Sequence, residues 1–151
     1  MENTDKIMMR EEWLLDNKMQ EIEKLPRFVE RIQQKLSLSP ALALNLNLVL
    51  EEALTNIIRY AYPDGREEKV LVVAESDAMK LVFVLMDGGI AFDPTQLPDA
   101  DISLSVKERP IGGLGFFLIR QMMDKVEYRR DGGMNVLTLT KFLREEPSTQ
   151  C

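Results

Sequence analysis

Apolar residues recur at helical spacing from Ala41 to Tyr62, and the rest of the prediction is organised around this stretch. Ser39 is a suitable N-cap and Pro40 a suitable first helical residue, while Pro63-Asp64-Gly65 is a turn signal that ends the pattern. The apolar positions that repeat at threes and fours are Leu42, Leu46, Val49, Leu50, Ala53, Ile57 and Ala61. The pattern therefore predicts one long amphipathic helix.

A polar stripe runs along the same helix. Asn45, Glu52, Asn56 and Arg59 are spaced by seven, four and three residues, so they project from one side. Glu52 and Asn56 lie one turn apart and can offer a carboxylate and an amide oxygen to a hydroxyl proton and to a hard cation such as Mg²⁺. The alternative is an ordinary helix whose polar edge faces water.

The remaining pattern predicts a strand and a helix before this segment, and two hairpins with a loop and a helix between them after it. The predicted elements are an edge strand at Glu12–Asn17, a helix within Met19–Leu36 that starts near Pro26, β-strands at Lys69–Ala74 and Lys80–Met86, a helix after Gly115, and β-strands at Lys125–Arg130 and Met134–Leu143. Ile90 to Pro110 is loop-like, with a helical turn around Ile102–Val106, and a stretch of this length is often a lid. The order favours an α+β two-layer sandwich with a mixed, mostly antiparallel sheet and helices on one face.

Two glycine clusters flank the long loop. The first, Asp87-Gly88-Gly89, ends a predicted strand, and its carboxylate can accept a hydrogen bond from an exocyclic amine such as that of adenine. A plain strand-ending turn explains the same residues.

The second cluster, Gly112-Gly113-Leu114-Gly115, opens a predicted helix, where backbone N–H groups suit a phosphate. It matches neither a P-loop nor a dinucleotide-binding glycine motif, and a flexible helix start is the alternative. Lys107 and Arg109, just upstream, can reach phosphate oxygens or can simply be solvated.

Composition narrows the classes of function. The chain has 151 residues, which predicts a single domain over residues 1–143 followed by a disordered tail at 144–151. A net charge of −6 argues against a nucleic-acid partner, and the absence of histidine excludes a His-based catalytic or metal site within this chain. Cys151 is the single cysteine, the N-terminus has no apolar signal core, and the apolar run around Ala41–Leu50 is too short to span a bilayer. A cytoplasmic protein without membrane contact is expected.

The three polar and glycine motifs, taken in order, resemble those of the superfamily of gyrase, heat-shock-90 chaperone, histidine kinase and mismatch-repair ATPases, which share the Bergerat nucleotide-binding fold (the GHKL superfamily). Glu52-x-x-x-Asn56 is similar to its N box, Asp87-x-Gly89 to its first glycine box and Gly112–Gly115 to its second. The compact size, the Phe92-Asp93-Pro94 segment and the GGLGFFLIRQMMDKVEY run look most like the stand-alone anti-sigma-factor serine/threonine kinases.

This resemblance implies a role for each motif residue. Asn56 would hold Mg²⁺, Glu52 would be the catalytic base, Asp87 would bind the adenine amine, and Gly89 would support that contact. The residues implied to wrap the ATP phosphates are Gly113, Leu114 and Gly115, with Arg109 beside them. Two departures stand out: Ala91 replaces a small glycine of many relatives, and Met134-Asn135 follows Gly133 where the family often has threonine.

The resemblance implies an ATP- and Mg²⁺-dependent kinase that sequesters a sigma factor and phosphorylates an anti-sigma-factor antagonist protein. Three alternatives remain: a non-catalytic ATP-binding partner-switching module, a detached catalytic domain of a histidine kinase, and an α+β domain that binds no nucleotide. The family also suggests a homodimer, for which Trp13 beside the edge strand marks a surface.

Overall fold

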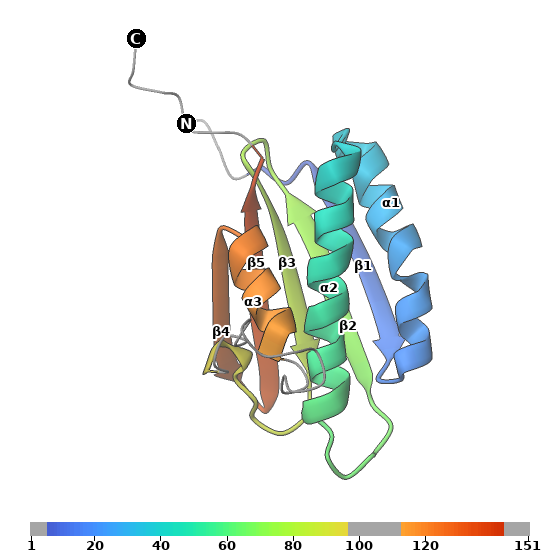
Figure 1. The fold of residues 1–151 in the computed structure, drawn as a ribbon, viewed down its shortest axis with the longest axis vertical. Helices are drawn as coiled ribbons and strands as arrows, with labels where there is room; N and C mark the ends of the chain where they lie inside the picture. The colour runs from blue at the N-terminus through green and yellow to red at the C-terminus, as the bar shows by residue number, and fades with distance from the viewer. Residues whose placement is uncertain (1–5, 97–112, 144–151) are drawn as a thin grey trace.

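The computed structural model describes residues 6–96 and 113–143, and these form a five-stranded sheet with helices on one face (Figure 1). The strands are β1 (Met9–Asp16), β2 (Lys69–Ser76), β3 (Lys80–Asp87), β4 (Lys125–Asp131) and β5 (Met134–Phe142). The helices are the 3₁₀ segments η1 (Met19–Lys24) and η2 (Pro94–Gln96) and the α-helices α1 (Leu25–Leu36), α2 (Pro40–Tyr60) and α3 (Gly113–Met122).

The strands lie in the order β1-β2-β3-β5-β4, so β1 is an edge strand as predicted. Every pairing among the described strands is antiparallel, which confirms the α+β two-layer sandwich and corrects the expectation of a mixed sheet. The helix α2 lies across the middle of the sheet between α1 and α3 (Figure 1). Strands that are distant in sequence therefore lie next to one another beneath α2.

The start of α2 follows the predicted cap. Ser39 has an extended backbone, its Oγ accepts a hydrogen bond from Leu42 N at 3.1 Å, and Pro40 is the first helical residue. By length and composition alone α2 could cross a membrane. It is buried instead as the central helix of this domain, with a core face made of Ala43, Leu46, Val49, Leu50, Ala53, Leu54, Asn56 and Ile57.

The first strand and helix differ from the prediction at their ends. β1 begins at Met9, three residues before the predicted Glu12, because Met9 pairs with Ser76 and is buried. The first helix is split into η1 and α1, and α1 begins one residue before Pro26. Trp13 does not mark a free surface, since its ring packs against Phe28 with 5.5 Å between the centroids.

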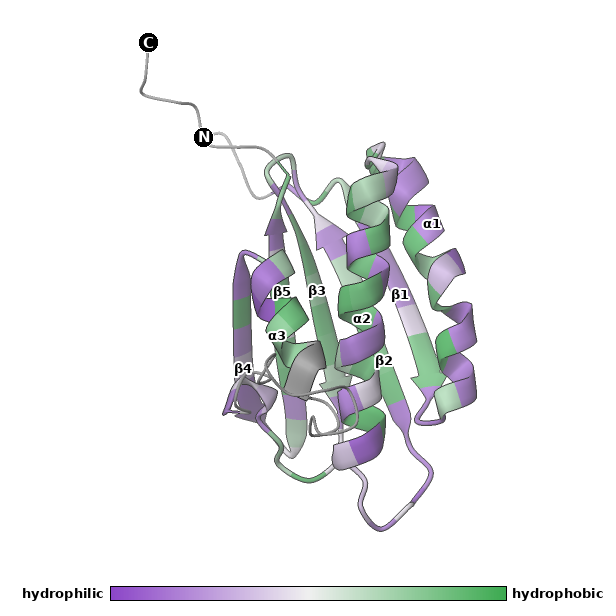
Figure 2. Ribbon diagram, viewed as in Figure 1, coloured by the Kyte–Doolittle hydropathy of each residue, from purple (hydrophilic) through white to green (hydrophobic). Residues whose placement is uncertain are grey.

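Strand alternation places polar residues at the end of an otherwise apolar face. On β3, Leu81, Phe83, Leu85 and Asp87 point toward the helices and all four are buried. Asn135 on β5 lies directly opposite Asp87 in the register. Figure 2 shows the hydrophobic colouring that dominates β3 and the more polar outer side of α1. The core layer therefore ends in a buried acid–amide pair.

The last hairpin has a two-glycine turn. Gly132 and Gly133 have φ angles of +56° and +81°, which is the left-handed region that a tight hairpin turn of this kind requires at both central positions. The turn fixes the register of β4 against β5, so that Arg130 lies opposite Asn135.

Candidate functional site

Asn56 and Asp87, predicted as parts of one site, line the same small pocket. The pocket lies under α2 at the ends of β3 and β5, and Phe116 from the first turns of α3 also borders it. Its lining residues are Ala53, Asn56, Ile57, Asp87, Phe92, Pro94, Phe116, Tyr128, Asn135 and Leu137. Two of the three predicted motifs thus contribute side chains to one place.

The amide of Asn56 is buried without a partner. Its side chain is 2% exposed, and neither its Oδ1 nor its Nδ2 forms a hydrogen bond with any described residue. A buried unpaired amide costs about 1–3 kcal/mol. The expectation that the polar edge of α2 faces water is therefore wrong for Asn56, and the orphaned oxygen is a free ligand.

The carboxylate of Asp87 is held through one of its two oxygens. Its Oδ1 accepts hydrogen bonds from Gly89 N and from Asn135 Nδ2, each at 2.9 Å. Its Oδ2 accepts none from a described residue. Burial raises the pKa of Asp87, while the hydrogen bonds from Asn135 and Gly89 and the charge of Arg130 oppose that rise. The free oxygen can accept a hydrogen bond from a bound group.

Gly89 is required by close packing as well as by the contact with Asp87. A Cβ built on Gly89 would lie 2.3 Å from the carbonyl oxygen of Ala61, at the end of α2. The chain is tied there by a hydrogen bond from Ile90 N to Ala61 O at 2.8 Å. This glycine therefore lets the segment after β3 lie directly against the end of α2.

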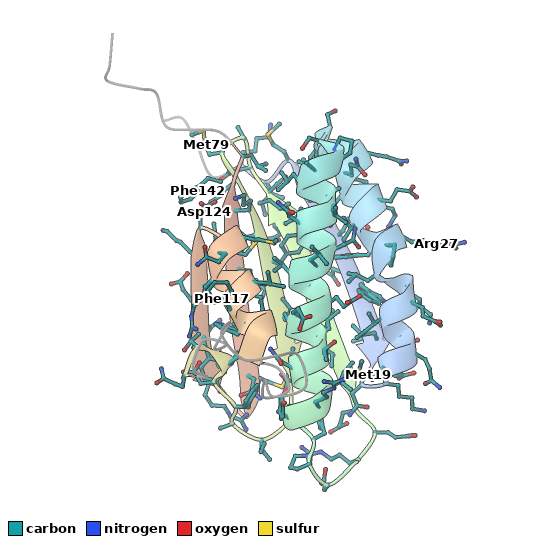
Figure 3. All side chains as sticks on the ribbon, viewed as in Figure 1. Met19, Arg27, Met79, Phe117, Asp124 and Phe142 are labelled. Atoms are coloured by element: carbon teal, nitrogen blue, oxygen red, sulfur yellow. The ribbon has the colours of Figure 1, made fainter. Side chains whose placement is uncertain are left out.

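Glu52 does not line the pocket that holds Asn56 and Asp87. It lines a wide neighbouring groove between η1, the start of α1 and α2, where Met19 lies at the foot of α1 (Figure 3). Burial and the neighbouring charge of Glu51 raise the pKa of Glu52, and Arg59 lowers it. No described residue donates a hydrogen bond to its carboxylate. Glu52 is therefore available to a hydroxyl that enters along the groove.

The second glycine cluster is only partly described. Helix α3 begins at Gly113, within the glycine cluster and two residues before Gly115, after which the helix was predicted; its residues Phe116 and Ile119, and Met123 just after it, are buried. The side chain of Leu114 and the surroundings of Gly113 and Gly115 are not described. Gly112, Lys107, Arg109 and the predicted turn at Ile102–Val106 lie outside the described residues. Their roles toward phosphate remain predictions.

The pocket under α2 is nearly closed. Its free volume is about 10 Å³, whereas a cavity needs about 10–15 Å³ to hold one water and small-molecule sites have about 300–1,000 Å³. Phe92 and Pro94 form one wall, and the Phe92 ring packs on Tyr60 with 5.4 Å between centroids. The pocket as it stands is therefore too small for a purine base.

Three further residues belong to the site, and sequence reasoning missed two of them. Tyr128 and Arg130 on β4 both donate hydrogen bonds to Asn135 Oδ1, and Arg130 also donates to Gly89 O at 2.8 Å. Asn135 itself was noted only as a departure from a family pattern. The two-glycine turn could have revealed only part of the cluster: it sets Arg130 opposite Asn135, whereas the pairing of Asn135 with Asp87 depends on β3.

The donor set fits a nucleotide–magnesium complex better than a metal held by protein alone. Among the described residues there is no group of three or more carboxylate, histidine or cysteine side chains able to hold a metal. Mg²⁺ is commonly held by one or two protein oxygens together with substrate phosphates and water. The orphaned oxygen of Asn56 supplies one such ligand.

Comparison with known proteins finds a matching family and similar relatives. Residues 15–141 match the family model described as histidine kinase-like ATPase domain. The chain is 31% identical over 119 residues to the serine/threonine-protein kinase BtrW of Bordetella bronchiseptica, covering 79% of this chain and 84% of that protein. It is also 33% identical over 106 residues to the serine-protein kinase RsbW of Bacillus cereus, covering 68% of this chain and 65% of that protein, slightly less than two thirds of its length.

Proposed function

This chain belongs to the histidine kinase-like ATPase domain family, and from that premise we propose that it is an ATP-dependent serine/threonine protein kinase of the anti-sigma-factor type. Its relatives include proteins named serine kinases, which supports kinase activity. The proposed acceptor is a serine or threonine of an antagonist protein, and the proposed second partner is a sigma factor. Both partners rest on the family resemblance.

The observation that carries the proposal is the unpaired amide of Asn56. Natural cores seldom leave both polar atoms of an amide buried and unbonded, because the cost is not recovered in the free protein. The cost is recovered if Asn56 Oδ1 binds Mg²⁺ and Nδ2 donates to a phosphate oxygen. When bound, the Mg²⁺ would neutralise charge on the phosphates.

Glu52 is proposed as the base that orients the acceptor hydroxyl. Glu52 precedes Asn56 by one helical turn in α2, and it lines the groove rather than the pocket. Four residues advance a helix by about 400°, so the two side chains are offset by about 40°. With so small an offset the two side chains are neighbours on the surface of α2, so an acceptor hydroxyl at Glu52 would lie next to the phosphates bound at Asn56.

The test separates binding from transfer. Glu52→Gln keeps the shape of the side chain and removes its basicity, so this variant should bind Mg²⁺-ATP with the affinity of the parent and lose phosphate transfer to a co-incubated antagonist protein. Labelled ATP and candidate antagonists provide the assay. Transfer at the parent's rate would show that Glu52 is not the base. Nucleotide binding by the parent without transfer to any antagonist would favour the non-catalytic partner-switching module.

A homodimer and a cytoplasmic location are also parts of the proposal. The helices cover one face of the sheet, and the opposite face carries an apolar row across neighbouring strands. Leu14 on β1 is 60% exposed on that face and lies beside Leu71, which pairs with Met86. A second copy could cover this row. The location rests on the single cysteine, Cys151, which suits a reducing compartment.

A further inference from the structure

The amide of Asn135 joins two sets of partners at the end of the sheet. Its Nδ2 donates to Asp87 Oδ1 at 2.9 Å and to the carbonyl oxygen of Ile90 at 2.7 Å. Its Oδ1 accepts hydrogen bonds from Tyr128 OH, from Arg130 NH1 at 3.1 Å and from Phe92 N at 3.2 Å. Asn135 is 5% exposed, and these five hydrogen bonds of its buried amide are all made to protein groups.

These partners fix the orientation of the amide. A flipped amide would turn its oxygen toward two acceptors, Asp87 Oδ1 and Ile90 O, and its NH₂ group toward the donors Arg130 and Phe92 N. The donor side of Asn135 therefore always faces Asp87. Because Gly89 N also donates to Asp87 Oδ1, that oxygen is occupied and the carboxyl group is held against rotation.

We propose that Asn135 is the positioning residue of the nucleotide site, holding Asp87 as a carboxylate whose Oδ2 alone reads the exocyclic amine of adenine. The inference rests on the proposed function and goes beyond it, because it assigns the selection of the base to the β5 amide. Tyr128 and Arg130 act on the far side of that amide and set its direction. None of the three is required to touch the nucleotide.

Because Asp87 is buried, the hydrogen bond from Asn135 Nδ2 is important for keeping it charged. A buried carboxylate is unstable as an anion unless hydrogen bonds favour its charged form. The charged and titratable groups around Asp87 are Arg130 and Tyr128 on β4, Tyr62 after α2, and Arg66. The Tyr62 hydroxyl accepts a hydrogen bond from Gly88 N, and Arg66 donates one to Gly88 O. Among the described residues, Arg130 is the cation whose charge favours the anion of Asp87. Removal of the Asn135 donor would therefore shift Asp87 toward its protonated form.

The deciding variant is Asn135→Asp, which keeps the acceptor oxygen for Tyr128 and Arg130 and replaces the donor to Asp87 by a second oxygen. Two neighbouring carboxyl groups do not both ionise easily and share one proton at lower pH. At pH 8 this variant should bind Mg²⁺-ATP about 10- to 100-fold more weakly than the parent in calorimetry. Toward pH 6 its affinity relative to the parent should rise, because a shared proton restores a donor to Asp87.

The matched control is Gln33→Glu, which likewise replaces an amide by a carboxylate but lies on α1, outside the pocket, where Gln33 Nε2 donates to Leu38 O. Its affinity for Mg²⁺-ATP should stay within about threefold of the parent at each pH. Asn135→Ser, which retains a short donor, should bind more tightly than Asn135→Asp at pH 8 and follow the pH trend of the parent. Titration of ATP itself is common to all proteins and cancels in the ratios.

The results separate this inference from the proposed function. If the parent binds no Mg²⁺-ATP, the proposed function fails and the inference fails with it. If the parent binds and Asn135→Asp loses the same factor at every pH, Asn135 only supports the fold and the inference is overturned. Equal affinity of Asn135→Asp and the parent at pH 8 overturns it as well. If Asn135→Asp does not fold, a pH trend of Asn135→Ser opposite to that of the parent overturns it.

Discussion

Replacing Gly89 by alanine tests how closely the Asp-Gly-Gly segment lies against α2. The added Cβ would lie 2.3 Å from Ala61 O, 2.6 Å from Ala61 Cβ and 2.8 Å from Ala61 C. Two of these atoms are backbone, so the conflict cannot be relieved by a side-chain rotation. The segment would have to move away and lose the hydrogen bond from Ile90 N to Ala61 O. Overpacking of about 1–3 kcal/mol and a lost hydrogen bond of about 1 kcal/mol predict a destabilisation of about 2–4 kcal/mol.

Gly88→Ala is the matched control, because the nearest atom to its added Cβ is Met134 Sδ at 3.5 Å, an ordinary contact. Urea unfolding of both variants and the parent, followed by circular dichroism, gives the two free-energy differences. Gly88→Ala should unfold within about 0.5 kcal/mol of the parent. A Gly89→Ala variant as stable as Gly88→Ala would refute the close contact.

Three further changes have defined outcomes. Ser39→Ala removes the cap of α2 and should lower the free energy of unfolding by about 1 kcal/mol in urea unfolding; no change would contradict the capping role. Glu11 accepts from Arg31 and Lys35, which lowers its pKa from the ordinary 4.5, so its stabilisation is present above pH 4.5 and is lost as the pH falls through the lowered value. Glu11→Gln should thus be less stable than the parent by about 1 kcal/mol or less at pH 7. This difference should close as the pH falls below the lowered pKa of Glu11, and it would be absent if the pair contributed nothing. Asn56→Leu removes two unpaired polar atoms from the core and should raise the free energy of unfolding of the free protein by about 1–3 kcal/mol; a less stable variant would show that the amide has a partner.

The hydrophobic pattern was sufficient to predict the main elements. The apolar positions of α2 repeat every three or four residues and face a single core, so periodicity and the Ser39-Pro40 start locate the helix to within one residue at its N-terminus. The last hairpin follows from Gly132-Gly133, because the turn needs two positive φ angles. Local chemistry alone decides these features.

Features that depend on distant partners were not predictable in the same way. The N-terminal part of β1 is polar and gives no strand signal, and it extends to Met9 because β2 continues to Ser76 and supplies its pairing partner. The contact that requires Gly89 is made with Ala61, twenty-eight residues away in sequence. Such constraints appear only when the sheet and α2 are assembled.

The residues of the candidate site also divide into those that motifs predict and those whose contacts depend on distant parts of the chain. Asn56 and Asp87 were predicted from motifs, and the structure places both on one pocket. Glu52 shares the stripe of Asn56 and lies about 40° from it around the helix, but it lines the neighbouring groove rather than the pocket. The contacts of Asn135 required the register of three strands, and no single motif contains that information.

Calorimetric titration of Mg²⁺-ATP into the parent and into Asn56→Leu tests the nucleotide site most directly. Leucine has the same branched arrangement of heavy atoms as asparagine and cannot bind a metal or a phosphate, so stability and binding should change in opposite directions. The parent should bind ATP in a manner that requires Mg²⁺, and the more stable variant should show no binding. Equal affinity in the two proteins would contradict the role of Asn56 and the nucleotide site built on it.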